Sequence, residues 1–189
     1  GYEVTQNFGG YGIVGVLKNG EGPTILYRTD LDALPMEEKT GLPYASKVRT
    51  KNFDGNEVGT MHSCGHDMHM AVWTGTARAL AKRKNEWSGT IMMIGQPAEE
   101  IGAGAAMMLN KGLYEKFPIP DYGIALHSSP TIPTGQVGFG KGYTMANTES
   151  IDIKIFGQGA HGASPHMSID PVVTASLIVM ELQTIVSRN

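Results

Sequence analysis

The chain has 189 residues, of which 41% are hydrophobic and 17% are charged, with a formal net charge of −3. This composition supports an ordinary hydrophobic core and excludes an intrinsically disordered tail. The small negative charge offers no basic surface to nucleic acid or to an anionic membrane. The sequence contains no run of about 18 apolar residues that could span a bilayer. We therefore expect neither a nucleic-acid partner nor a membrane partner.

The single cysteine and the two chain ends lead to two further expectations. One cysteine cannot form a disulfide within the chain, which favours a reducing compartment, and no signal-peptide pattern opens the sequence. We therefore expect a cytoplasmic protein. The length suits one domain with part of a second. Neither end carries a start or stop signal, which predicts that the chain is a fragment.

The first 59 residues are predicted to form strands followed by a loop. Residues 11–17 and 24–27 have strand character, and a Lys-Asn-Gly turn at 18–20 separates them. Asp30 and Asp32 follow the second strand, where residues at i and i+2 point to the same face. Such a pair can bind or orient a ligand, but it is also ordinary turn chemistry before a proline. Residues 36–59 are polar and rich in turn residues, which predicts a surface loop.

Residues 61–70 concentrate the groups that bind transition metals. They hold Cys64, the only cysteine, together with three of the six histidines. Cys64 and His66 lie at i and i+2, and the glycine between them predicts a tight loop in which both side chains turn toward one ion. The alternative is a plain histidine stripe along a helix, because His62 and His69 flank His66 at helical spacing. Asp67 is the expected N-cap of a helix that runs to about residue 84.

Further strands and helices alternate from residue 89 to residue 127. The apolar run 89–94 predicts a buried strand that ends just before the adjacent carboxylates of Glu99 and Glu100, which repel each other unless a cation or a proton intervenes. A helix is expected from 102 to about 111, and a third strand at 122–126 is followed by His127. This alternation predicts an α/β sheet of mostly parallel strands with helices on both faces, and functional groups gather at the carboxyl ends of such strands.

The pattern changes after residue 142. Residues 149–157 alternate apolar and polar side chains, which predicts a half-buried strand. A glycine-rich loop with two histidines, His161 and His166, follows, and a helix with proline in its first turn is predicted from 170 to about 186. The boundary is expected between Thr144 and Thr148, which gives one domain at 1–146 and the start of another at 147–189.

Four of these segments together resemble a known family. The sequences RTDLDALP at 28–35, MHSCGHD at 61–67, QPAEE at 96–100 and GAHGASPH at 159–166 are similar to motifs of the M20 metallopeptidases. The most similar branch is that of the amidohydrolases, which includes hippurate hydrolases, N-acyl amino acid hydrolases and auxin-conjugate hydrolases. The resemblance implies an α/β catalytic domain with a two-metal centre, and an inserted α+β lid domain through which the protein forms a homodimer.

The resemblance also implies a role for individual residues. The expected ligands of two divalent ions, zinc or manganese, are Cys64, His66, Glu100 and His127. Glu99 would be the general base, Asp32 would orient the site, and His161 would reach the reacting carbonyl from the lid. The family's last metal-binding histidine would lie beyond Asn189. These roles together imply that a metal-activated water cleaves the amide bond of a small N-acyl amino acid or amide conjugate.

Two other functions are consistent with parts of the pattern. Cys64 could be a nucleophile with His66 or His127 as its base, as in a Cys/His hydrolase. That interpretation assigns no catalytic role to Glu99 and Glu100. The second alternative is a catalytically incomplete fragment that only binds a metal or a ligand.

Overall fold

A computed structural model describes residues 1–52, 54–145 and 148–187 of the chain. The described residues divide into two compact units, 1–136 and the residues from 137 onward. The predicted boundary between 146 and 147 falls on positions outside the described residues and stays a prediction. In the part of the chain that is described, no helix combines the length and the apolar character needed to cross a membrane.

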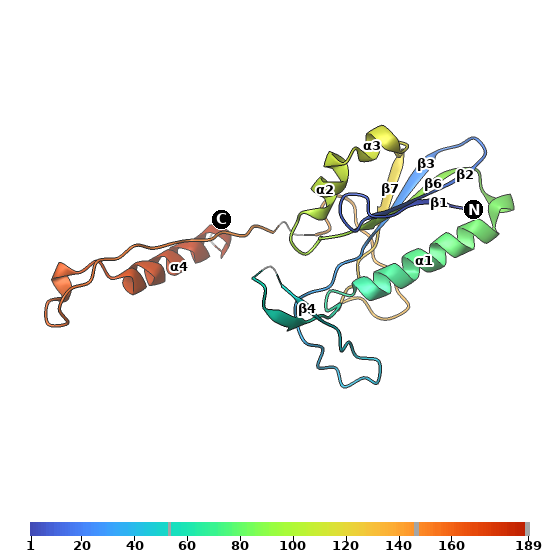
Figure 1. Cartoon of the computed structure of the whole chain (residues 1–189). Helices are drawn as coiled ribbons and strands as arrows, with labels where there is room; N and C mark the ends of the chain where they lie inside the picture. Colours follow the sequence, from blue (N-terminus) through green and yellow to red (C-terminus); the bar gives the residue numbers. More distant parts are fainter. Residues whose placement is uncertain (53, 146–147, 188–189) are drawn as a thin grey trace. The chain divides into compact units, whose positions relative to one another are not determined.

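The first unit is built on a five-stranded sheet in which four strands run in the same direction (Figure 1). β2 pairs antiparallel with β1 and with β6, while β3 pairs parallel with both β6 and β7. This arrangement confirms the predicted α/β class with a mostly parallel sheet. In spatial order the strands are β1 (Glu3–Thr5), β2 (Ile13–Asn19), β6 (Gly89–Gln96), β3 (Thr24–Asp30) and β7 (Tyr122–Ala125).

The position of β6 follows from its apolar character. It is the longest strand of the sheet, and six of its eight residues are buried, as expected for a strand with neighbours on both sides. β2 and β3, which are separated in sequence by a short turn, therefore lie on either side of β6 and do not pair with each other. Its register sets Asp30 opposite Gln96, so the carboxyl ends of β3 and β6 are level.

Helices cover both faces of this sheet, as predicted (Figure 1). On one face, Trp73 and Leu80 pack against a buried cluster that includes Leu17 and Met93. On the other face, Met108 belongs to a second buried cluster with residues of β2 and β6. The helices of the first unit are α1 (His66–Lys82), the 3₁₀ helix η1 (Lys84–Glu86), α2 (Gly104–Asn110) and α3 (Leu113–Lys116).

The start of α1 differs from the prediction that Asp67 is its N-cap. The helix begins at His66, and Gly65 occupies the N-cap position with a left-handed backbone (φ 80°) and no capping side chain. Asp67 lies inside the first turn, where its Oδ1 accepts a hydrogen bond from the N–H of Met68. A carboxylate there suits the helix dipole. The left-handed glycine lets the chain turn sharply from Cys64 into the helix.

The segment between β3 and α1 contains more structure than the predicted loop. β4 (Arg49–Lys51) and β5 (Glu57–Gly59) pair antiparallel in a small separate sheet. An ion pair between Arg49 and Glu57 links the two strands across this hairpin. The polar composition that predicted a loop is that of a solvated hairpin, which has little apolar surface to bury.

The second unit consists of the helix α4 (Pro171–Ser187), the 3₁₀ helix η2 (Pro165–Met167) and irregular backbone. The helix matches the prediction in extent. The strand predicted at 149–157 is wrong, because the described residues of this segment form no ladder. A strand needs a hydrogen-bonding partner, and in the described part of this unit only an isolated bridge between Gln158 and Ile169 is formed.

The turn after β6 is unusually tight. Ala98 has a φ of 50°, in the left-handed region that disfavours residues with a Cβ. Its carbonyl accepts hydrogen bonds from the N–H groups of Ala103 (3.1 Å) and Gly104 (3.0 Å). Gly104 lies so close to the preceding chain that a Cβ there would be 1.5 Å from the carbonyl oxygen of Pro97. The turn that carries Glu99 and Glu100 therefore depends on glycine at position 104.

Gly104→Ala is expected to lower the free energy of unfolding by about 1–3 kcal/mol, the usual cost of forcing a methyl group into a packed site. Urea denaturation measures the change. Gly75→Ala is the matched control, because a Cβ at Gly75 in α1 would meet nothing within 4 Å. Alanine is favoured over glycine inside a helix, so the control should gain about 1 kcal/mol. A Gly104→Ala variant as stable as the wild type would contradict the close approach.

Candidate metal centre

The predicted site residues of the first unit meet at the carboxyl ends of the parallel strands. Asp32 follows β3, Glu99 and Glu100 follow β6, and His127 follows β7. Cys64 and His66 join them because the chain enters α1 beside this edge of the sheet (Figure 1). Side chains spaced over about 95 residues of sequence are thereby brought to one place.

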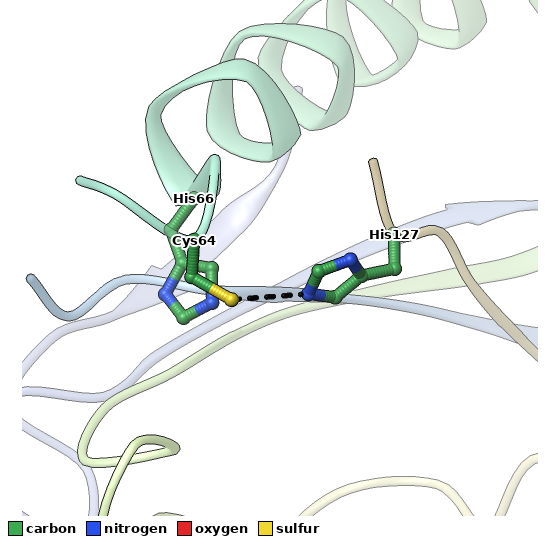
Figure 2. Close-up of side chains that lie close together, drawn as sticks. All are labelled: Cys64, His66 and His127. Atoms are coloured by element: carbon green, nitrogen blue, oxygen red, sulfur yellow. Dashed lines mark hydrogen bonds between the residues drawn. The ribbon is translucent and has the colours of Figure 1, made fainter. Parts of the chain in front are cut away.

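Cys64, His66 and His127 form the first group of potential ligands (Figure 2). Sγ of Cys64 lies 3.4 Å from Nε2 of His127. One ligand atom from each of the three residues lies within 4.8 Å of the others. Nδ1 of His127 is 2.7 Å from the carbonyl oxygen of Ser128. Since a carbonyl only accepts hydrogen bonds, Nδ1 carries the hydrogen and Nε2 offers its lone pair toward Cys64.

His66 connects this group to the two glutamates. Its Nδ1 lies 2.9 Å from the carbonyl oxygen of Asp32, so the hydrogen is on Nδ1. Its Nε2 faces Oε1 of Glu100 at 3.8 Å and Oε2 of Glu99 at 3.9 Å. Within the described residues, Nε2 of His66 and Oε1 of Glu100 are buried without a hydrogen-bond partner. Two acceptors buried face to face are unfavourable unless a cation or a proton lies between them.

The surroundings of the Cys64 thiol also indicate a cation site. Burial raises its pKa above the ordinary value, and the carboxylates of Glu100 and Glu99 raise it further. The side chains around the thiol therefore favour its protonated form, which is a poor nucleophile. A bound cation would reverse the balance and stabilise the thiolate as a ligand. The donor set thus fits a metal centre better than a free catalytic thiol.

Asp32 connects the end of β3 to the segments that carry His66 and Glu100. Its Oδ2 accepts a hydrogen bond from the N–H of Glu100 (3.0 Å). Its carbonyl oxygen lies close to Nδ1 of both His66 and His62, and its Oδ1 is 3.5 Å from Nδ1 of His66. Both the backbone and the carboxylate of Asp32 therefore contribute to the position of His66 and Glu100.

Two histidines without an assigned role in the sequence also contribute to the site. Nδ1 of His62 lies 3.1 Å from the carbonyl oxygen of Asp32. His69 is buried and accepts a hydrogen bond from the backbone N–H of Ser128. Burial lowers the pKa of His69, and the imidazoles of His127 and His66 lower it further. The sequence signal for these two residues was the helical spacing of His62, His66 and His69. That spacing alone could not distinguish a functional site from a histidine stripe without a function.

His161 is the one predicted site residue that lies in the second unit. It is exposed, and its Nδ1 accepts a hydrogen bond from the N–H of Ala163 (3.1 Å). It belongs to none of the three groups of potential ligands found among the described residues. Its predicted role in catalysis stays a prediction.

The fold and the side chains together define an α/β protein with a cluster of potential metal ligands at the carboxyl ends of its parallel strands. The chain belongs to peptidase family M20/M25/M40, whose pattern matches residues 26–184. The family predicted from the four motifs is thereby confirmed.

Individual relatives lie in the amidohydrolase branch. N-acetyl-L-cysteine deacetylase of Bacillus subtilis is 46% identical over 169 residues, which cover 89% of this chain and 38% of the relative. Hippurate hydrolase of Campylobacter jejuni is 40% identical over 190 residues, which cover 100% of this chain and 46% of that relative. The crystal structure of Bacillus subtilis YXEP is described as a dinuclear metal binding peptidase of the M20 family. It matches with a TM-score of 0.64 at 39% identity, and the match covers 75% of this chain and 37% of that one. The chain spans less than half the length of each.

Proposed function

We propose that this chain supplies most of the metal centre of an amidohydrolase that cleaves the amide bond of a small N-acyl amino acid or a related amide conjugate. The observation that carries the proposal is the pair of buried atoms without hydrogen-bond partners, Nε2 of His66 and Oε1 of Glu100, which face each other 3.8 Å apart. Cys64 and His127 lie beside His66 and complete a donor set typical of metal sites. Membership of the M20 family supports the reaction class.

The proposed ligands of two divalent ions are Cys64, His66, Glu100 and His127. The mixture of thiolate and imidazole suits zinc, and the carboxylates also suit manganese. When bound, such ions lower the pKa of a water molecule and polarise the amide carbonyl. The protein's contribution is to hold the donors in place, which Asp32 does for His66 and Glu100.

Glu99 is the proposed general base. Its side chain is 39% exposed, against 20% for Glu100, so Glu99 is the more accessible of the two to water and substrate. It takes the proton from the attacking water and later delivers it to the leaving amine. This role requires a carboxylate within hydrogen-bond reach of that water, at the edge of the ligand cluster.

The substrate class rests on the relatives. Their names assign them N-acetyl-L-cysteine and hippurate, and we extend the common chemistry, a small N-acyl amino acid, to this protein. The test is to assay the whole protein, loaded with Zn²⁺ or Mn²⁺, against N-acetyl, N-benzoyl and indole-acyl amino acids, with release of the free amino acid as the readout. Metal-dependent release is expected. Full metal occupancy without hydrolysis of any of these compounds would favour a metal-binding module.

The distance of 3.4 Å between Cys64 and His127 also favours, by itself, a Cys/His nucleophilic hydrolase. The two mechanisms predict opposite responses to inhibitors. For a metal centre, a strong chelator should abolish activity in the wild type, and Cys64→Ser should weaken metal binding because serine is a poorer ligand than thiolate. Activity and metal content are measured on the same samples. Inactivation by a thiol alkylator combined with resistance to the chelator would establish the nucleophile instead.

A further inference from the structure

His69 is a buried titratable residue that the proposed mechanism does not use. It lies in the first turn of α1, three residues after His66, and its exposed fraction is 5%. Its ring centroid is 4.6 Å from that of His127, and the two planes meet at 65°. His69 therefore packs edge-to-face against a proposed metal ligand.

His69 is hydrogen-bonded to the segment that carries His127. The backbone N–H of Ser128 donates to Nε2 of His69 at 2.8 Å. Because Nε2 accepts, the hydrogen of neutral His69 is on Nδ1. Ser128 is the residue next to His127, and its carbonyl oxygen also fixes Nδ1 of His127 at 2.7 Å. The bond to His69 thus holds the peptide segment that sets the orientation of the His127 ring.

A second contact brings the same segment against the start of α1. Oγ of Ser128 donates to the carbonyl oxygen of Cys64 at 3.4 Å. A Cβ on Gly65 would lie 2.5 Å from this Oγ, so glycine at position 65 permits the approach. The segment after β7 and the loop that carries Cys64 are therefore packed together, with His69 as the buried hydrogen-bond acceptor between them.

A direct role of His69 as a metal ligand is less well supported. Asp30, His66 and His69 form a buried group with ligand atoms within 4.8 Å of one another. Asp30, however, is ion-paired with Arg28, so its charge is already balanced. The Nε2 atom of His69 is engaged by Ser128. Among the described residues, Nδ1 of His69 is buried without a hydrogen-bond partner, so the positioning role rests on the bond that Nε2 accepts from Ser128.

We propose that His69 is a positioning residue, whose Nε2 anchors the Ser128 peptide and thereby directs Nε2 of His127 toward the metal centre. The proposal rests on the proposed function, in which His127 is a metal ligand. Residues that orient metal ligands typically change metal affinity by about 10- to 100-fold when they are replaced. The effect should depend on the hydrogen-bond acceptor and not on the volume of the ring.

The experiment titrates Zn²⁺ into metal-free whole protein with a competing chelator and compares three variants. His69→Phe keeps a ring but leaves the Ser128 N–H without an acceptor, and the apparent Kd for Zn²⁺ should rise about 10- to 100-fold. His69→Gln places an amide oxygen near the position of Nε2 and should restore most of the affinity. His127→Ala removes the proposed ligand itself and should weaken binding as well.

The outcomes separate the two proposals. Unchanged affinity in His69→Phe beside weakened affinity in His127→Ala would overturn the role of His69 and leave the metal centre intact. Unchanged affinity in His127→Ala would overturn both. If circular dichroism shows that His69→Phe does not fold, the proposal is tested instead by the tautomer of His69 in the wild type. ¹⁵N NMR of the imidazole should show hydrogen on Nδ1, and hydrogen on Nε2 would overturn the proposal.

Discussion

Replacement of Glu99 by glutamine should lower turnover by at least about 10²-fold and leave the metal content unchanged. Glutamine has the size of glutamate but cannot accept a proton at neutral pH, and removal of a general base typically costs this much or more. Glu99 is not a proposed ligand, and its carboxylate is the more exposed of the adjacent pair. The measurement combines kcat with metal analysis of the same preparation.

Two controls make this result specific. Glu100→Gln changes a proposed ligand and should lower metal occupancy. Glu86→Gln changes an exposed glutamate, which is ion-paired with Arg83 beyond the end of α1, and should leave both metal content and rate unchanged. A Glu99→Gln enzyme with near-normal turnover would exclude Glu99 as the base, whatever the metal content.

The parts of the fold that the sequence predicts well are those determined by local patterns. The apolar run of β6 and the proline in the first turn of α4 each mark an element from the local sequence. The common location of the candidate ligands is predictable for a related reason, whereas the division of Glu99 and Glu100 into base and ligand is implied only by the resemblance to the family. Cys64, Glu100 and His127 each adjoin the end of a strand or the start of a helix, and parallel strands place those ends together.

Features that depend on distant contacts are not visible in local patterns. The short turn between β2 and β3 does not reveal that β6 lies between them, because strand order is set by long-range packing. The alternation at 149–157 indicates strand propensity, but propensity alone forms no ladder without a partner strand. Likewise, the acceptor role of His69 depends on Ser128, which is 59 residues away.

The loop that carries His161 is exposed and rich in glycine. His161 itself is exposed, its loop contains Gly157, Gly159 and Gly162, and a Cβ at either Gly159 or Gly162 would meet nothing within 4 Å. His161 therefore contributes nothing to a core. We propose that residues 147–189 begin a lid that mediates a homodimer, and that His161 donates a hydrogen bond to the developing oxyanion, in the site of a partner subunit.

His161→Ala in the whole protein is expected to lower turnover by about 10²- to 10³-fold, because a donor to the oxyanion acts in the transition state and has little effect on substrate affinity. Metal content should not change, because His161 is not a proposed ligand. His166→Ala, at an exposed histidine five residues further along, is the matched control and should retain the rate. Loss of metal in His161→Ala would make His161 a ligand, and an unchanged rate with unchanged metal would remove it from the mechanism.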